Sequence, residues 1–331
     1  MRIRSLTPIC VAASVLILFA AVASAQPSGG PYGPIAQTYE VPKDAAHVYY
    51  VAPDGKADAP GLTPGAATTI EAAIARVVTG DAIIMRGGTY RTGSLTFNQG
   101  ITIQPYRDEV PVLKGTAVAT EWQALRDGVW RTPWTRLFPQ RPADWWQRGR
   151  EGMRTPLHRF NNDMVFIDGR FLQSAGWEGG LDADTYYIDY EGGFVYIAVD
   201  PKGHVIEITA HDSAFVRTTR PVHGKQPDRK GPVLRGLTLT QYAYRALEVN
   251  GVEPDGPADP ATFGKDAVGT TLENMTITYC SRVAAYLRGD GLVIRNSLVS
   301  DTSTEGIYII ASSDVLLERN IFRHNNIERI T

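Results

Sequence analysis

The chain repeats one six-residue pattern after Gly231: LRGLTL at 234–239, LENMTI at 272–277, IRNSLV at 294–299 and LERNIF at 317–322. Each copy begins with an aliphatic residue and carries an aliphatic or aromatic residue five positions later. The first residues of successive copies lie 38, 22 and 23 positions apart, and the 38 becomes 22 once 16 residues of a polar loop over 252–269 are set aside. A recurring period of 22 or 23 residues predicts a solenoid.

A second β-rich run begins six residues after the end of each of the first three copies. These runs are RALEV at 245–249, VAAYL at 283–287 and EGIYI at 305–309. Their third and fifth residues share one parity and are expected to face inward. Short strands at this period without a helical stripe predict an all-β, right-handed parallel β-helix. A leucine-rich repeat has a similar period, but its L-x-x-L-x-L-x-x-N pattern does not recur here.

The sequence pattern over 47–115 predicts an N-terminal cap followed by the first coils of the solenoid. Thr69 can cap a short helix with an apolar stripe, and Gly80-Asp81 ends that helix. Such a helix can cover the strand edges that an open solenoid end exposes. Short β-rich runs follow at 82–85, 94–97, 101–104 and 110–113.

The region 116–231 contains all six tryptophans and interrupts the coils. Strand–turn–strand runs predict an inserted antiparallel β-sandwich. Its tryptophans either pack in the core and hinge or line a sugar-binding surface. The coils resume over 232–331, and the last one stops within a strand, which predicts a fragment of a longer solenoid. The clearest strands of the insert lie at 164–167, 186–190, 194–199 and 205–209.

The first residues predict an export signal. Met1–Arg4 is cationic, Ile9–Val22 is mostly apolar, and Ala23-Ser24-Ala25 forms a small-residue cleavage site. The apolar run is shorter than the ~20 residues that cross a bilayer, so a cleaved signal over 1–25 is preferred to an uncleaved anchor. We expect a secreted or periplasmic protein without membrane association after cleavage, with a Gly/Pro-rich linker over 26–46.

The composition is that of an ordinary globular protein. Of 331 residues, 43% are hydrophobic and 21% charged, and 33 basic against 35 acidic side chains give a formal charge of -2. These values exclude a disordered or collagen-like chain, and without a basic excess no nucleic-acid partner is expected. After signal cleavage Cys280 is the single cysteine, so the core rather than a disulfide must stabilise the fold.

Two groups of short motifs stand out along the chain. The first comprises Tyr49–Ala52, Pro60–Pro64, Thr69-Ile70, Gly80-Asp81 and Gly88–Tyr90, and the second comprises Trp122, Gly128–Trp130, Phe166–Gly169, Tyr186–Asp189, Val195–Ile197 and Asp200-Pro201. Through the first group the opening of the fold resembles pectate-lyase-like β-helix proteins, and through the second the insert is similar to that of glycoside hydrolase family 141-like proteins. The resemblance implies secreted bacterial proteins that cut plant or other complex polysaccharides with catalytic carboxylates on the coils.

Aligned positions become columns in space, because the coils of a parallel β-helix stack about 4.8 Å apart. One column reads Gln241, Tyr279, Asp301 and His324. Asp301 and His324 are therefore expected to be neighbours. They form either a carboxylate–imidazole pair that shares a proton or binds a substrate hydroxyl, or a hydrogen-bonded turn.

A second column reads Arg245, Val283, Glu305 and Glu328. Two stacked carboxylates repel each other, so the pKa of one is expected to rise and that group could act as a general acid. A carboxyl separation of ~5 to 5.5 Å would suit a retaining glycosidase. The alternative is that both side chains extend into water.

A third column holds Glu248, Tyr286 and Tyr308 on the outward parity. The tyrosines could carry a sugar ring, or they could stack on each other for stability. The candidate catalytic residues are Asp301, Glu305 and His324, and the candidate substrate-binding residues are Tyr286, Tyr308 and Arg245.

Three functions remain open: a glycoside hydrolase that uses two carboxylates on a polysaccharide, a polysaccharide lyase, and a non-catalytic glycan-binding solenoid. A lyase would use a Lys or Arg base, often with calcium, whereas no cofactor or metal is expected for the hydrolase. No lysine follows Asp266, which favours the hydrolase. Asp255, Asp259 and Asp266 could supply oxygen ligands, but their spacing matches no calcium loop and a solvated loop is the preferred interpretation.

Overall fold

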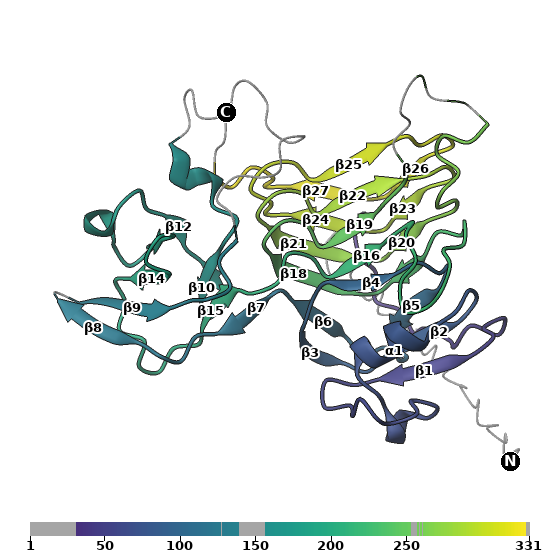
Figure 1. The fold of residues 1–331 in the computed structure, drawn as a ribbon, viewed down its shortest axis with the longest axis horizontal. Helices are drawn as coiled ribbons and strands as arrows, with labels where there is room; N and C mark the ends of the chain where they lie inside the picture. Colours follow the sequence, from purple (N-terminus) through teal and green to yellow (C-terminus); the bar gives the residue numbers. More distant parts are fainter. Residues whose placement is uncertain are drawn as a thin grey trace, which may run out of the picture.

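A computed structural model describes residues 31–126, 128–138, 156–252, 257, 259 and 261–328. These residues form a right-handed parallel β-helix with a smaller β domain at its side (Figure 1). The predicted fold class is therefore confirmed. The predicted signal peptide over 1–25 lies outside the described residues. Across the described part of the chain, no helix combines the length and the apolar character needed to cross a membrane.

Three parallel sheets form the walls of the solenoid. The first sheet contains β1 (Val48–Val51), β2 (Ala82–Met85), β5 (Thr102–Pro105), β17 (Val233–Arg235), β20 (Thr271–Glu273), β23 (Val293–Arg295) and β26 (Leu316–Glu318). The second contains β3 (Gly88–Arg91), β6 (Pro111–Lys114), β18 (Thr238–Tyr242), β21 (Thr276–Cys280), β24 (Leu298–Ser300) and β27 (Ile321–Arg323). The third contains β4 (Leu95–Phe97), β16 (Phe215–Arg217), β19 (Leu247–Val249), β22 (Ala285–Arg288) and β25 (Ile307–Ile310).

The repeated six-residue pattern spans a corner between two sheets. Leu234 lies in the first sheet and Leu239 in the second, and both are 0% exposed. In one straight strand, side chains five positions apart would point to opposite faces. Gly236 between them has a φ of 67°, and this left-handed residue turns the chain so that both apolar side chains face the core. The equivalent residues Asn274, Asn296 and Arg319 have φ values of 58°, 49° and 52°.

One short helix caps the solenoid, as the sequence predicts. Helix α1 (Ile70–Arg76) begins after Thr69, whose hydroxyl accepts a hydrogen bond from the Ala72 backbone N–H at 3.2 Å. Its apolar stripe is buried in the solenoid core with Val51 and Leu95. Figure 1 shows the helix beside β1 and β2 at the N-terminal end of the stack. A 3-10 turn, η1 (Pro64–Ala66), precedes it.

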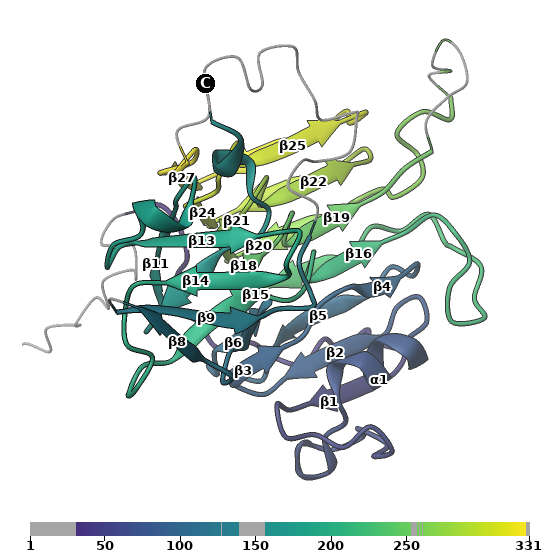
Figure 2. The same ribbon diagram turned by 60° about the vertical axis from the view of Figure 1, so that its left-hand side comes forward.

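The insert consists of two sheets that pack across a shared apolar core, which fits the predicted β-sandwich (Figure 2). All of its strand pairs are antiparallel except β12–β13. One sheet contains β7 (Thr116–Val118), β10 (Val165–Ile167), β11 (Arg170–Phe171) and β15 (Ile206–Thr209). The other contains β8 (Gln123–Arg126), β9 (Val129–Pro133), β12 (Gln173–Ser174), β13 (Thr185–Asp189) and β14 (Phe194–Ile197), and the 3-10 turns are η3 (Leu157–Phe160) and η4 (Glu178–Gly180).

The insert is shorter than the predicted range 116–231. Strand β16 lies inside that range but pairs in parallel with β4 and β19, so it belongs to the third sheet of the solenoid. The insert therefore interrupts a coil at the corner after β6, and the chain returns to the solenoid after β15. The sequence did not reveal this return because a single coil split by the insert shows no period.

Residues 33–39, predicted as part of a linker, instead bind along the corner between the first and second sheets. The Gly33 N–H donates to the Arg319 carbonyl at 2.8 Å, and the Tyr39 N–H donates to the Arg107 carbonyl at 2.9 Å. Between them, Asn274 accepts from the Ile35 N–H at 2.5 Å and donates to the Ile35 carbonyl at 2.8 Å. This segment, here called the N-terminal strap, therefore links several coils.

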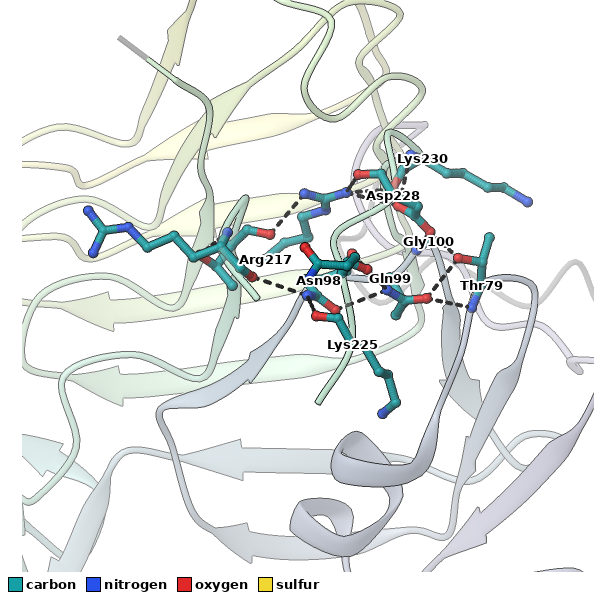
Figure 3. A network of polar contacts seen from close by, with 11 residues as sticks. Thr79, Asn98, Gln99, Gly100, Arg217, Lys225, Asp228 and Lys230 are labelled. Carbon is teal, nitrogen blue, oxygen red and sulfur yellow. Dashed lines mark hydrogen bonds and ion pairs between the residues drawn. The ribbon is translucent and has the colours of Figure 1, made fainter. Parts of the chain in front are cut away.

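A buried arginine ties the loop after β16 to the first coils (Figure 3). Arg217 is 0% exposed and pairs with Asp228 at 2.9 Å. The other carboxylate oxygen of Asp228 accepts from the Gly100 N–H at 2.7 Å and from the Thr79 hydroxyl. Burial lowers the pKa of Arg217, and Asp228 opposes that shift. The network holds the end of β16, and so the third sheet, against the N-terminal cap.

We predict that Asn274→Gly lowers the free energy of unfolding by about 1–3 kcal/mol. Glycine keeps the left-handed corner conformation but removes the hydrogen bonds to Ile35 and the 2.7 Å bond to the Tyr39 hydroxyl. Asn296→Gly is the matched control, because Asn296 occupies the same corner one coil further on; we expect a change within about 0.5 kcal/mol. Urea unfolding measures both values, and equal losses in the two variants would contradict the role of the strap.

Candidate functional site

The predicted substrate-binding tyrosines lie next to each other on the outer face of the third sheet. The parallel register pairs Glu248 with Tyr286 and Tyr286 with Tyr308. The two rings are stacked, with centroids 6.5 Å apart and an interplanar angle of 28°. The stacked pair therefore offers two neighbouring aromatic rings, each with apolar surface beside a polar hydroxyl.

Arg245 joins this row from the corner before β19. Its Nε lies 2.6 Å from Oε2 of Glu248, and its guanidinium carbon lies 5.6 Å from the centroid of the Tyr286 ring. Both partners of the ion pair are partly buried. The structure therefore brings Arg245, Tyr286 and Tyr308 together as one row of charged and aromatic groups, which is a surface able to contact both the hydroxyls and the C–H face of a sugar.

Glu305 extends the same row. The Tyr308 hydroxyl donates to Oε1 of Glu305 at 3.3 Å. Oε2 of Glu305 is buried and has no hydrogen-bond partner among the residues that the structure describes. A buried acceptor without a partner is unfavourable, and a ligand could bond to this oxygen only after the Glu305 side chain turned outward.

Asp301 and His324 form a second group at the corner between the second and third sheets. Nδ1 of His324 lies 3.6 Å from Oδ1 of Asp301, and the Ser300 hydroxyl donates to Oδ2 at 2.6 Å. The Asp301 side chain is 23% exposed and that of His324 is 73% exposed. The two residues are neighbours as predicted, and their φ values of 58° and 50° show that the column is also a left-handed turn. Buried Thr302 and Ser303 separate this group from Glu305 in the chain.

Glu328 differs from the prediction of a carboxylate stacked on Glu305. Its side chain is 4% exposed and lies 2.9 Å from Nη1 of Arg159 in the insert. Burial raises the pKa of Glu328, and the hydrogen bond from Arg159 opposes the rise. The expected shift is thus present, but its cause is burial under the insert rather than a second carboxylate.

The insert covers the corner between the second and third sheets one coil before Asp301. Tyr279, one coil before Asp301 in the same column, contacts the rings of Phe166 and Phe171 at centroid distances of 5.3 and 6.1 Å. Nη2 of Arg282 donates to the Phe160 carbonyl at 2.7 Å. The corner that carries Asp301 and His324 therefore borders the insert as well as the third sheet.

A buried ion cluster fixes the other end of the insert. Glu207 of β15 is 2% exposed and lies 2.6 Å from Arg91 and 2.9 Å from Lys114, both in the second sheet. Burial alone would raise the pKa of Glu207, but Lys114 and Arg91 hold it below its usual value. Removing Arg91 or Lys114 would leave the negative charge of Glu207 poorly compensated between the insert and the solenoid.

Asp163 is a buried carboxyl that the sequence analysis missed. Its side chain is 0% exposed, and Oδ2 accepts from the Phe138 N–H at 3.0 Å and from the Tyr190 hydroxyl at 3.3 Å. Burial raises its pKa to about 8. The run Asn161-Asn162-Asp163 directly before an apolar strand was the available signal, because three polar residues rarely enter a core without a specific role.

Two of the three loop aspartates that could have supplied calcium ligands are described, and both form turn contacts. Asp259 accepts from the Ala261 N–H at 2.9 Å, and Asp266 accepts from the Val252 N–H at 3.0 Å. Asp255 lies outside the described residues. The described residues contain no group of three or more His, Cys, Asp or Glu side chains placed to hold a metal ion.

Comparisons with known proteins agree with this architecture. The family model described as right-handed β-helix region matches residues 260–330. A solved structure entitled "The complex structure of XylC with xylose" has a TM-score of 0.57 at 16% identity, over 84% of this chain and 62% of that chain. Another, entitled "Glycoside hydrolase", has a TM-score of 0.55 at 13% identity, over 86% of this chain and 74% of that one. No curated protein sequence matches the chain.

These likenesses establish a shared right-handed parallel β-helix fold. The chain spans 62% of the length of the XylC chain, so part of that structure has no counterpart here.

We predict that Asp163→Asn flattens the dependence of stability on pH. The folded carboxyl binds its proton more tightly than the unfolded one, because burial raises its pKa from 3.8 to about 8. The stability that this proton contributes is fully present below about pH 4 and is lost as the pH rises through about 8. Asparagine stays neutral, so the wild type should lose up to about 1.4 kcal/mol per pH unit relative to the variant across this window.

Urea unfolding at pH 4, 6 and 8 checks this expectation. Asp184→Asn is the control, because Asp184 lies on the same domain with its side chain 79% exposed. Parallel pH profiles for the wild type and Asp163→Asn would contradict the assignment of a protonated buried carboxyl.

Proposed function

We propose that the chain is a carbohydrate-active protein, a glycoside hydrolase that binds a polysaccharide over the outer face of the third sheet. The observation that carries the proposal is the continuous row of Arg245, Tyr286, Tyr308 and Glu305, in which an aromatic pair ends at a carboxylate. Aromatic faces bind the C–H surfaces of sugars, and a carboxyl group beside them can act on a glycosidic oxygen.

Glu305 and Asp301 are the proposed pair of catalytic carboxylates. In such a pair, one group protonates the leaving oxygen of the glycosidic bond, while the other activates a water molecule or attacks the anomeric carbon. Tyr308 orients Glu305 through its hydroxyl, and Ser300 and His324 hold Asp301. The insert, which borders the corner of Asp301, would form one wall of the groove.

Further support comes from the solved structures that share the fold. One was determined with xylose and another is described as a glycoside hydrolase. The likeness of the insert to glycoside hydrolase family 141-like proteins points to the same chemistry. We further propose that the protein acts outside the cytoplasm as a secreted or periplasmic protein, because residues 1–25 have the pattern of a cleaved signal peptide.

We predict that Glu305→Gln and Asp301→Asn each lower kcat on soluble xylan by roughly 10²–10⁴-fold, the usual contribution of a general acid or base. The assay measures new reducing ends and, in parallel, ultraviolet absorbance from an unsaturated product. Glu318→Gln is the matched control, because Glu318 lies in the first sheet away from the proposed groove.

Reducing ends without new absorbance would support the hydrolase. Absorbing products would instead indicate a lyase, and unchanged activity in both carboxylate variants would overturn the assigned pair.

We predict separately that Tyr308→Ala weakens substrate binding by about three- to tenfold in KM and also lowers kcat. The ring supplies apolar surface to the row, and its hydroxyl holds Glu305. Tyr308→Phe keeps the ring and removes only the hydroxyl, so it should leave KM nearly unchanged and lower kcat. A Phe variant that matches the wild type in both constants would contradict the orienting role of the hydroxyl.

A further inference from the structure

The insert contains a shallow pocket, open to the surface and here called the cavity, that the proposed reaction does not use. It has a volume of about 370 Å³ and lies between the segment Val118–Thr120, strand β9 and the loop after β14. A volume of this size is at the lower end of the range for small-ligand sites and suits one or two sugar units. The cavity is formed entirely by the insert.

Two tryptophans line the cavity. Trp122 and Trp130 are both half-buried and pack against the apolar core of the insert, so part of each ring is fixed and the rest faces the cavity. The Trp122 indole N–H donates to the Ala119 carbonyl at 3.0 Å, which sets the plane of that ring. Indole rings held in this way lose little conformational entropy when a ligand stacks on them.

Three polar side chains also line the cavity. His204, Asp200 and Lys202 lie in the loop between β14 and β15. Nδ1 of His204 lies 2.6 Å from Oδ2 of Asp168, whose other oxygen accepts from the Val205 N–H at 2.8 Å. This pair fixes the imidazole ring and, in the neutral form, leaves Nε2 as an acceptor.

The loop itself is also held in shape. Oδ1 of Asp200 accepts from the Lys202 N–H at 2.9 Å, which closes a tight turn in this loop. The lining thus carries one carboxylate, one ammonium group and one imidazole, without an excess of either charge. Such a lining favours a neutral hydroxyl-rich ligand over a polyuronate.

A second cavity of about 360 Å³ adjoins the first. The two share Val118, Ala119 and Thr120 as lining residues, and the second adds Trp134. The Trp134 indole N–H donates to the Thr209 carbonyl at 2.9 Å, so this ring is also fixed. Adjoining cavities with fixed tryptophans suit consecutive units of a chain better than an isolated monosaccharide.

We propose that the insert is a carbohydrate-binding module whose site, formed by Trp122, Trp130 and the His204 loop, binds neutral sugar units of a polysaccharide. This site is separate from the row on the third sheet and does not depend on which reaction occurs there. Binding at this site would keep the protein on a polymeric substrate. The effective concentration of the polysaccharide near the groove would therefore rise.

Affinity electrophoresis of the full chain through native gels with soluble xylan, glucomannan or polygalacturonate tests the proposal. We expect retardation by at least one of the two neutral polymers, and a weakening of its apparent Kd by about three- to tenfold in Trp130→Ala. Because Trp130 packs against the core, His204→Ala is the second variant, and thermal unfolding verifies that both variants fold. Trp177→Ala is the matched control, since Trp177 is 67% exposed on the insert and does not line the cavity.

Combining these variants with Tyr286→Ala separates the two sites. If the insert binds independently, retardation persists in Tyr286→Ala and falls further when Trp130→Ala is added, even if the groove of the proposed function proves inactive. Unchanged retardation in folded Trp130→Ala and His204→Ala, retardation by polygalacturonate alone, or no retardation by any of the three polymers would overturn the proposal.

Discussion

The parallel stacking of coils is the constraint on which the rest of the molecule depends. Hydrogen bonds between successive strands fix the spacing and register, so residues at the same position of each coil must lie in one column. Inside the solenoid this register produces one column of Leu234, Leu272 and Ile294, whose side chains are 0–2% exposed. Outside, the same register places Tyr286 against Tyr308. The core and the candidate site therefore lie on the inner and outer faces of the same stacked strands.

Residues in the left-handed conformation form the corners that divide the solenoid into three sheets. Gly236 and its equivalents turn the chain from the first sheet to the second, and the column of Asp301 turns it from the second to the third. A corner also leaves side chains pointing outward beside a sheet face, which is why Asp301 borders the third sheet. The insert leaves the solenoid at one such corner and packs along it through Phe166 and Glu207, so the fold places a second domain next to the candidate site.

Periodic features could be predicted from the sequence, whereas contacts between distant, non-periodic segments could not. The coils and the neighbouring pair Tyr286 and Tyr308 follow from spacing and parity, and the capping helix follows from its capping residue and apolar stripe. Arg245 was predicted in a different column, and its contacts with Glu248 and Tyr286 appear only in the structure. The burial of Asp163, the pairing of Glu328 with Arg159 and the docking of the strap on Asn274 depend on how the insert and the N-terminal segment approach the solenoid. Strand β16 was misplaced for a related reason, because the insert separates it from its own coil.

In the proposed function, the outer face of the third sheet binds the polysaccharide at the point where Tyr308 contacts Glu305. The most direct measurement is a crystal structure of Glu305→Gln soaked with xylo-oligosaccharide. We expect a sugar ring on the face of Tyr286 or Tyr308, with a glycosidic oxygen within hydrogen-bond reach of the side chain at position 305. Sugar density confined to another face of the solenoid, with the tyrosine row empty, would contradict it.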